Sequence, residues 1–182
     1  MSSCVWGISY GFVDKRGKKL LRRMVATPMN KTYYLLSQTL SRLILTLFDS
    51  IVLILFANLV FDTQIQGSIF ALVLVFISGS FAFIGISVLI ASRFENTQVA
   101  NGVINAVTMP MMLLSGIFFS YYNFPQWFIP IIKYLPLTLF TDSVRSIFVE
   151  GAEIAQVFIS VCILSAIGFV TFITGAKIFK WY

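Results

Sequence analysis

The sequence has no histidine and few charged residues. Histidine is the commonest general base and the commonest metal ligand, so its absence argues against most hydrolases and most metal sites. Only 11% of the 182 residues are charged, whereas a soluble domain carries about a quarter. The two cysteines, Cys4 and Cys162, lie in apolar runs and lack a metal-binding spacing. These shortages argue against an enzyme and against a soluble protein.

Glycine-rich phosphate-binding motifs of the P-loop and dinucleotide-binding types are also missing. We therefore expect this chain itself to bind no nucleotide, cofactor or metal. What the sequence does have is apolar side chains, since 58% of its residues are hydrophobic. The net charge of +6 lies mostly beside the apolar runs, so it predicts no binding to nucleic acid. The composition indicates an integral membrane protein.

Four apolar runs are long enough to cross a bilayer as helices, which takes about 20 residues. They cover about 40–61, 68–91, 99–119 and 155–176. Residues 1–13 are apolar but too short to cross, and basic residues follow them instead of preceding them. We interpret this segment as the inner end of a truncated span, with a short interfacial helix as the alternative. The predicted fold class is all-α, a polytopic transmembrane helical bundle.

The basic residues predict the orientation of this bundle. Ten of the thirteen lie on one side of the predicted topology: seven within 14–31, together with Arg93, Lys177 and Lys180. Basic residues beside spans mark the cytoplasmic side of a membrane. We therefore expect a multi-pass protein of the inner (cytoplasmic) membrane with 14–31 and the C-terminus in the cytoplasm. Residues 62–67 and 120–153 are expected outside.

The basic segment 14–31 has two interpretations. Wound as a helix, it places its basic side chains on one face and Leu20, Leu21 and Met24 on the other. Such a helix could anchor the protein on anionic lipid headgroups. It could instead dock on a cytoplasmic partner. The residues that would make the contact are Gly17, Lys18, Lys19, Leu20, Leu21, Arg22, Arg23 and Met24.

The span at 99–119 carries a polar face. Side chains at helical spacing line up there: Asn101, Asn105, Thr108, Met112 and Ser115. Polar side chains in lipid need partners, so this face points into the bundle, across a subunit interface or along a substrate path.

One acidic residue, Asp49, falls near the middle of the span at 40–61. An ionisable residue at that depth is a candidate for ion or proton coupling. The alternative, which we favour, is a structural role, with the carboxyl group protonated or tied to Thr46 and Arg42 on its own helix.

The segment 120–153 contains three prolines that divide it into pieces too short to span: Pro125, Pro130 and Pro136. We expect two half-helices that re-enter the outer leaflet, which requires cover by protein or a water-filled cavity. Trp127 would lie at the interface, where aromatic side chains collect. Thr138 could cap a short helix that brings Asp142 and Arg145 together at i, i+3.

Three stretches together resemble the C-terminal part of the membrane subunit of ABC-2 type transporters, the permeases of bacterial ABC exporters. Gly17–Pro28 looks like the loop after the second span of that family, and Met109–Phe119 looks like its penultimate span. Pro125–Phe128 and Leu135–Arg145 look like its outer re-entrant segment. Their order and spacing cover nearly the whole chain.

The resemblance implies a six-span subunit that works as a dimer, with each copy bound to a cytoplasmic ATPase that holds ATP and Mg²⁺. It implies export by alternating access, with Gly17–Met24 as the ATPase contact. Two other classes stay open: a membrane scaffold or assembly subunit without a translocation path, and, less well supported, an intramembrane enzyme. A polar face buried wholly within one subunit would favour the scaffold.

Overall fold

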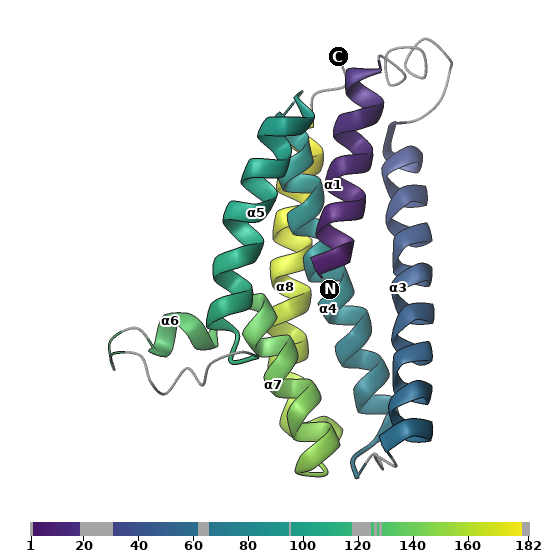
Figure 1. Cartoon of the computed structure of the whole chain (residues 1–182), viewed down its shortest axis with the longest axis vertical. Coiled ribbons are helices and arrows are strands. Elements are labelled where there is room, and N and C mark those ends of the chain that lie inside the picture. Colours follow the sequence, from purple (N-terminus) through teal and green to yellow (C-terminus); the bar gives the residue numbers. More distant parts are fainter. Residues whose placement is uncertain are drawn as a thin grey trace.

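The computed structural model describes residues 2–18, 31–61, 66–94, 96–117, 125, 127 and 129–179. The regular elements of these residues are helices without strands, which confirms the all-α prediction for this part of the chain. Figure 1 shows the long helices lying side by side in an elongated bundle. In chain order they are α1 (Ser2–Gly17), α3 (Lys31–Phe61), α4 (Ile69–Arg93), α5 (Thr97–Leu114), α6 (Ile129–Lys133), α7 (Pro136–Val149) and α8 (Ile154–Ile178).

Within the described residues, three helical stretches are long and apolar enough to cross a membrane: Tyr33–Val60, Ile69–Arg93 and Ile154–Ile178. They match three of the four predicted spans, although α3 begins at Lys31, well before the predicted start at 40. The predicted span at 99–119 corresponds to α5, which has 18 residues and ends at Leu114. Ser115 and Gly116 follow, and the positive φ of 77° at Gly116 turns the chain away from the helix.

Figure 1 shows which helices begin and finish at each end of the bundle. We call one the basic end: α1, α4 and α8 finish there and α3 begins. It carries Lys15, Arg16, Lys18, Arg93 and Lys177. We call the opposite one the far end: α7 finishes there and α8 begins, beside Glu150 and Glu153.

The closest helix pair is α4 and α8, whose backbones meet at glycines. A Cβ atom on Gly168 would lie 2.9 Å from the carbonyl carbon of Phe81, and one on Gly175 would lie 2.8 Å from the amide nitrogen of Leu89. Real Cβ atoms do not approach backbone atoms so closely, so α8 can lie this near to α4 only because these positions lack a side chain.

Helix α4 is also the centre of the bundle, because α1, α3, α5, α7 and α8 all pack on it. In its most apolar stretch 56% of the residues are buried, compared with 12% for α3. Helix α3 is therefore peripheral, and most of its apolar surface faces outward. At the far end, the amide of Gly67 donates to the carbonyl of Ile147 at 3.1 Å, which ties the start of α4 to α7.

Helix α1 continues past residue 13, where the first apolar segment ends, to Gly17, its last residue. In its last turn, Lys15 and Arg16 lie over the rings of Tyr34 and Phe179 of neighbouring elements.

Thr138 does not cap a helix as predicted. Helix α7 begins at Pro136, whose fixed φ suits the first turn, with Leu135 at the N-cap. Thr138 is the third helical residue and is fully buried.

The α4–α8 contact generates a prediction. Gly168→Ala should destabilise the protein by about 1–3 kcal/mol, because the added methyl group overpacks the backbone of α4. Gly102→Ala is the matched control, since a Cβ on Gly102 meets nothing within 4 Å. It should leave stability unchanged or raise it slightly, because alanine favours helix. Thermal unfolding in detergent, followed by tryptophan fluorescence, measures both, and equal midpoints would contradict the close-packing argument.

Candidate functional site

The predicted partner-contact segment begins where α1 ends. Gly17 and Lys18 are exposed at the basic end. Lys18 donates a 2.8 Å hydrogen bond to the carboxylate of Asp14, one turn earlier, and this bond raises the pKa of Lys18. The rest of the segment, Lys19–Met24, lies outside the described residues, so its apolar face of Leu20, Leu21 and Met24 remains a prediction.

Arg16, one position before this segment, is buried, with 7% of its surface exposed, whereas Lys18 is exposed. Its guanidinium donates a 2.8 Å hydrogen bond to the carbonyl of Phe94, directly after α4. It also lies 4.8 Å from the ring centre of Phe179, directly after α8. The sequence predicted that Arg16 shares one helical face with the other basic residues of 14–31. The local pattern gave no sign of its burial, because both partners are remote in sequence.

The five residues of the predicted polar face on α5 do not share one environment. Ser115 is buried and donates to the carbonyl of Met112, and Thr108 is half-buried and donates to the carbonyl of Ile104. Asn101 is half-buried, whereas Asn105 and Met112 are exposed. The face therefore runs along the border between the buried and the exposed sides of α5, and it is not buried wholly within this chain.

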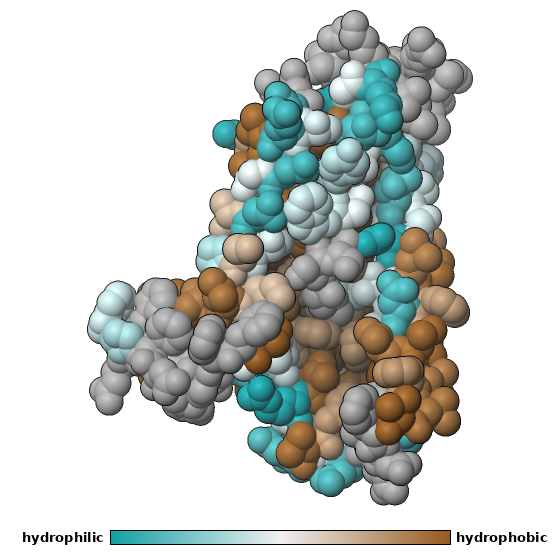
Figure 2. Space-filling model, viewed as in Figure 1, coloured by the Kyte–Doolittle hydropathy of each residue, from teal (hydrophilic) through white to brown (hydrophobic). Residues whose placement is uncertain are grey.

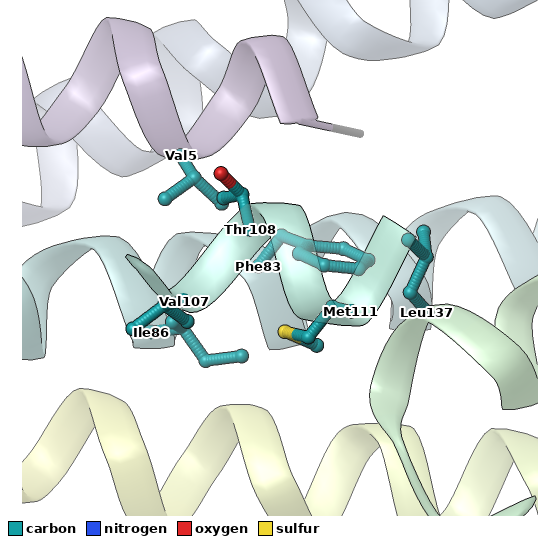
Figure 3. A pocket seen from close by; sticks show the side chains of 7 residues that line it. All are labelled: Val5, Phe83, Ile86, Val107, Thr108, Met111 and Leu137. Atoms are coloured by element: carbon teal, nitrogen blue, oxygen red, sulfur yellow. The ribbon is translucent and has the colours of Figure 1, made fainter. Parts of the chain in front are cut away.

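Thr108 lines a small apolar cavity (Figure 3). Its walls come from α1, α4, α5 and α7: Val5, Phe83, Ile86, Val107, Thr108, Met111 and Leu137. The volume is about 10 Å³, which is at the lower limit for one water molecule. A small-molecule site usually needs about 300 Å³ or more. This cavity is therefore packing space between helices and not a substrate site.

Arg42 and Asp49 on α3 do not form the predicted pair. The structure shows an ion pair between Lys18 and Asp14 at 2.8 Å, and none between Arg42 and Asp49, both of which it describes. The guanidinium of Arg42 lies against α1, where a Cβ on Gly7 would be 2.7 Å from it. The hydroxyl group of Thr46 donates a hydrogen bond to the carbonyl of Arg42. A second hydrogen bond, of 2.8 Å, joins this hydroxyl group to the thiol of Cys4. Arg42 and Thr46 thus attach α3 to α1.

Asp49 lies one turn beyond Thr46 on α3, with its side chain exposed. Its neighbours Phe48 and Val52 are exposed and apolar. Figure 2 shows hydrophobic side chains covering the part of α3 nearer the far end, while hydrophilic ones gather at the basic end and continue along α1 and α5.

The residues of the predicted outer segment lie mostly toward the far end. Pro125 and Trp127 are exposed, and Pro136 opens α7. Asp142 and Arg145 line an open cavity of about 420 Å³ between α7 and α8, without forming an ion pair with each other. Its other walls are almost entirely polar: Ser143, Ser146, Glu150, Gln156, Val157 and Ser160.

Comparison with known proteins gives one match. A family model described as ABC-2 family transporter protein matches residues 1–177, nearly the whole chain. Curated proteins and solved structures give no match.

The position of Asp49 generates a prediction. Asp49→Asn and Asp49→Leu should both insert into the membrane and unfold at the parent temperature or above it, because each removes an ionisable group from exposed apolar surroundings. Asn58→Leu, at another exposed polar position of α3, is the control for a general effect of added hydrophobicity. Membrane yield and thermal midpoint measure the outcome. If both Asp49 variants lost membrane yield or thermal stability while Asn58→Leu did not, the carboxylate would have a required partner.

Proposed function

Because the chain belongs to the ABC-2 transporter family, we propose that it is the permease subunit of an ATP-driven exporter in the cytoplasmic membrane. Family membership makes it a membrane component of an ABC transporter, a transport protein that is not itself catalytic. The family match over residues 1–177 is the observation that carries the proposal.

An ATPase subunit is the partner that the family implies. We propose that it is a separate cytoplasmic chain that binds ATP and Mg²⁺ and contacts Gly17–Met24. Two observations support this contact. The segment follows α1 at the basic end, and both described residues of it, Gly17 and Lys18, are exposed.

We propose that two copies of the chain meet along the exposed side of α1 and α5. Polar and small residues face outward there: Asn105 is exposed, and Cβ atoms on Gly11 and Gly102 would meet nothing within 4 Å. An exposed amide in a membrane helix needs a partner outside its own chain or water in a path. This favours a transporter over a scaffold, whose polar face would be satisfied within one subunit.

Alternating access would depend on how closely each helix packs against the rest of the bundle. Helices α4 and α8 form a close pair that resists deformation, whereas α3 is mostly unburied. In the proposed cycle, ATP binding closes the ATPases and pushes on Gly17–Met24, and the bundle tilts to open outward. We further propose that α6 and α7 form a re-entrant segment in the outer leaflet, with the polar cavity at Asp142 and Arg145 facing outside.

Orientation gives the first test. In a background with Cys4→Ser and Cys162→Ser, a membrane-impermeant maleimide should label Glu153→Cys in intact cells. It should label Lys18→Cys only after permeabilisation, because basic loops stay in the cytoplasm. Both positions are exposed. Labelling of Lys18→Cys in intact cells would reverse the proposed topology.

The ATPase contact gives the second test. Leu21→Asp or Gly17→Trp should uncouple ATP hydrolysis from transport, because a docking helix must fit a groove. The protein should still insert, since the flanking basic residues are kept. Leu21→Met, which keeps an apolar side chain, is the control. Lys18→Gln combined with Lys19→Gln should have the smaller effect. The measurements are co-purification with the ATPase and substrate-stimulated ATP turnover.

A larger effect of the charge-removing pair than of Leu21→Asp would mean that the segment acts mainly as a lipid anchor. In that case the docking proposal fails, although membership of the family stands.

A further inference from the structure

We propose that Arg16 is the positioning residue that transmits movement of the contact segment Gly17–Met24 to helices α4 and α8. The inference rests on the proposed ATPase contact and concerns how that contact acts on the bundle. It adds a residue that is not part of the segment itself, since Arg16 lies one position before Gly17, within α1.

Arg16 joins the ends of two helices that both finish at the basic end. The carbonyl that accepts its hydrogen bond belongs to Phe94, the C-cap of α4, and the ring beside its guanidinium belongs to Phe179, the C-cap of α8. Carbonyl groups at a helix C-terminus lack intrahelical donors, and the helix dipole makes that end negative. A cation at this place is therefore favoured by both helices at once.

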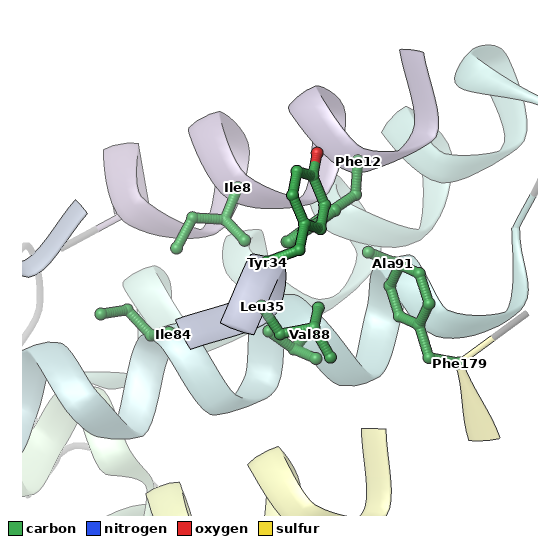
Figure 4. Close-up of a cluster of buried hydrophobic side chains, with 8 residues drawn as sticks. All are labelled: Ile8, Phe12, Tyr34, Leu35, Ile84, Val88, Ala91 and Phe179. Atoms are coloured by element: carbon green, nitrogen blue, oxygen red, sulfur yellow. The ribbon is translucent and has the colours of Figure 1, made fainter. Parts of the chain in front are cut away.

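Aromatic rings extend the junction to α3, and Figure 4 shows three of them, Phe12, Tyr34 and Phe179. Phe12, one turn before Arg16 on α1, packs edge-on against Phe179 at 5.4 Å and against Tyr34 at 6.0 Å. Lys15 lies 5.7 Å from the centre of the Tyr34 ring. The end of α1 thus touches the beginning of α3 and the ends of α4 and α8 through neighbouring side chains.

This geometry suits transmission because the two sides of the junction are stiff. On one side, α1 is helical up to Gly17, so a push on the next residues acts on a rigid rod. On the other side, α4 and α8 are held together at Gly168 and Gly175, so a force on either end moves both helices. Arg16 connects these rigid parts with a directional hydrogen bond, which a purely apolar contact would lack.

The first experiment tests the junction without an ATPase. Spin labels are placed at Gly17→Cys and Lys177→Cys, both exposed, in the Cys4→Ser, Cys162→Ser background. The distance distribution between them should be narrow in the parent and broad in Arg16→Met. Arg93→Met, the same change at an exposed arginine of the basic end, should stay narrow. Arg16→Lys keeps a cation able to reach Phe94 and should recover part of the narrow distribution.

The proposal fails if the distance distribution stays narrow in Arg16→Met or if it is as broad in Arg93→Met as in Arg16→Met. It also fails if Arg16→Lys and Arg16→Met give the same distribution. If Arg16→Met does not fold, Phe179→Leu takes its place. This change removes the ring and keeps the hydrogen bond, so the distribution should broaden partially, and an unchanged distribution would count against the proposal.

The second experiment separates transmission from a merely structural role. Labels at Gln98→Cys on α5 and Lys177→Cys on α8, both exposed, are followed in the complex with the ATPase. ATP with vanadate should shift the distance between these labels in the parent, and Arg16→Met should lose the shift while the ATPase still co-purifies. A full shift in Arg16→Met would refute transmission through Arg16. Failure of any ATPase to co-purify with the parent would instead refute the proposed function.

Discussion

The contact between α4 and α8 is the constraint on which the rest of the structure depends. Gly85, Gly168 and Gly175 let the two backbones approach until a single added carbon would overlap the facing helix. In lipid, water provides no hydrophobic force between helices, so close packing of small residues has to hold them together. With α8 against one side, α4 can bury its remaining surface against α1, α5 and α7. The three clusters of buried apolar residues all include residues of α4.

The helices around this pair differ in burial: α1 has about half of its described side chains buried, whereas α3 has few. Helix α3 contacts α1 at two places: the guanidinium of Arg42 lies beside Gly7, and a hydrogen bond joins Cys4 and Thr46. Most of the apolar surface of α3 faces outward. The exposed side of α5 carries Asn105. A closely packed centre with polar and apolar faces around it is compatible with the proposed movement, in which the outer faces change contacts.

Much of the fold could be predicted from the sequence, because hydropathy and length are local properties. The positions of α3, α4 and α8 follow from runs of apolar residues, and the resemblance in Gly17–Pro28 and Met109–Phe119 pointed to the family that the match over residues 1–177 shows. The boundaries were less accurate. Thr138 was predicted as a cap from its residue type, whereas Pro136 begins the helix two residues earlier. The helical period of α5 gave a single polar face, and packing divided it between buried and exposed environments.

The sequence by itself determined that the described part of the chain is helical and apolar, and which family the chain belongs to. These properties depend on composition and on spacings of a few residues. Only the tertiary structure decided that Arg16 is buried while Lys18 is exposed, although both stand in the same basic run. The partner of Arg16 is the carbonyl of Phe94, 78 positions away. No local pattern encodes such a contact, because it arises from the way in which α1, α4 and α8 pack side by side.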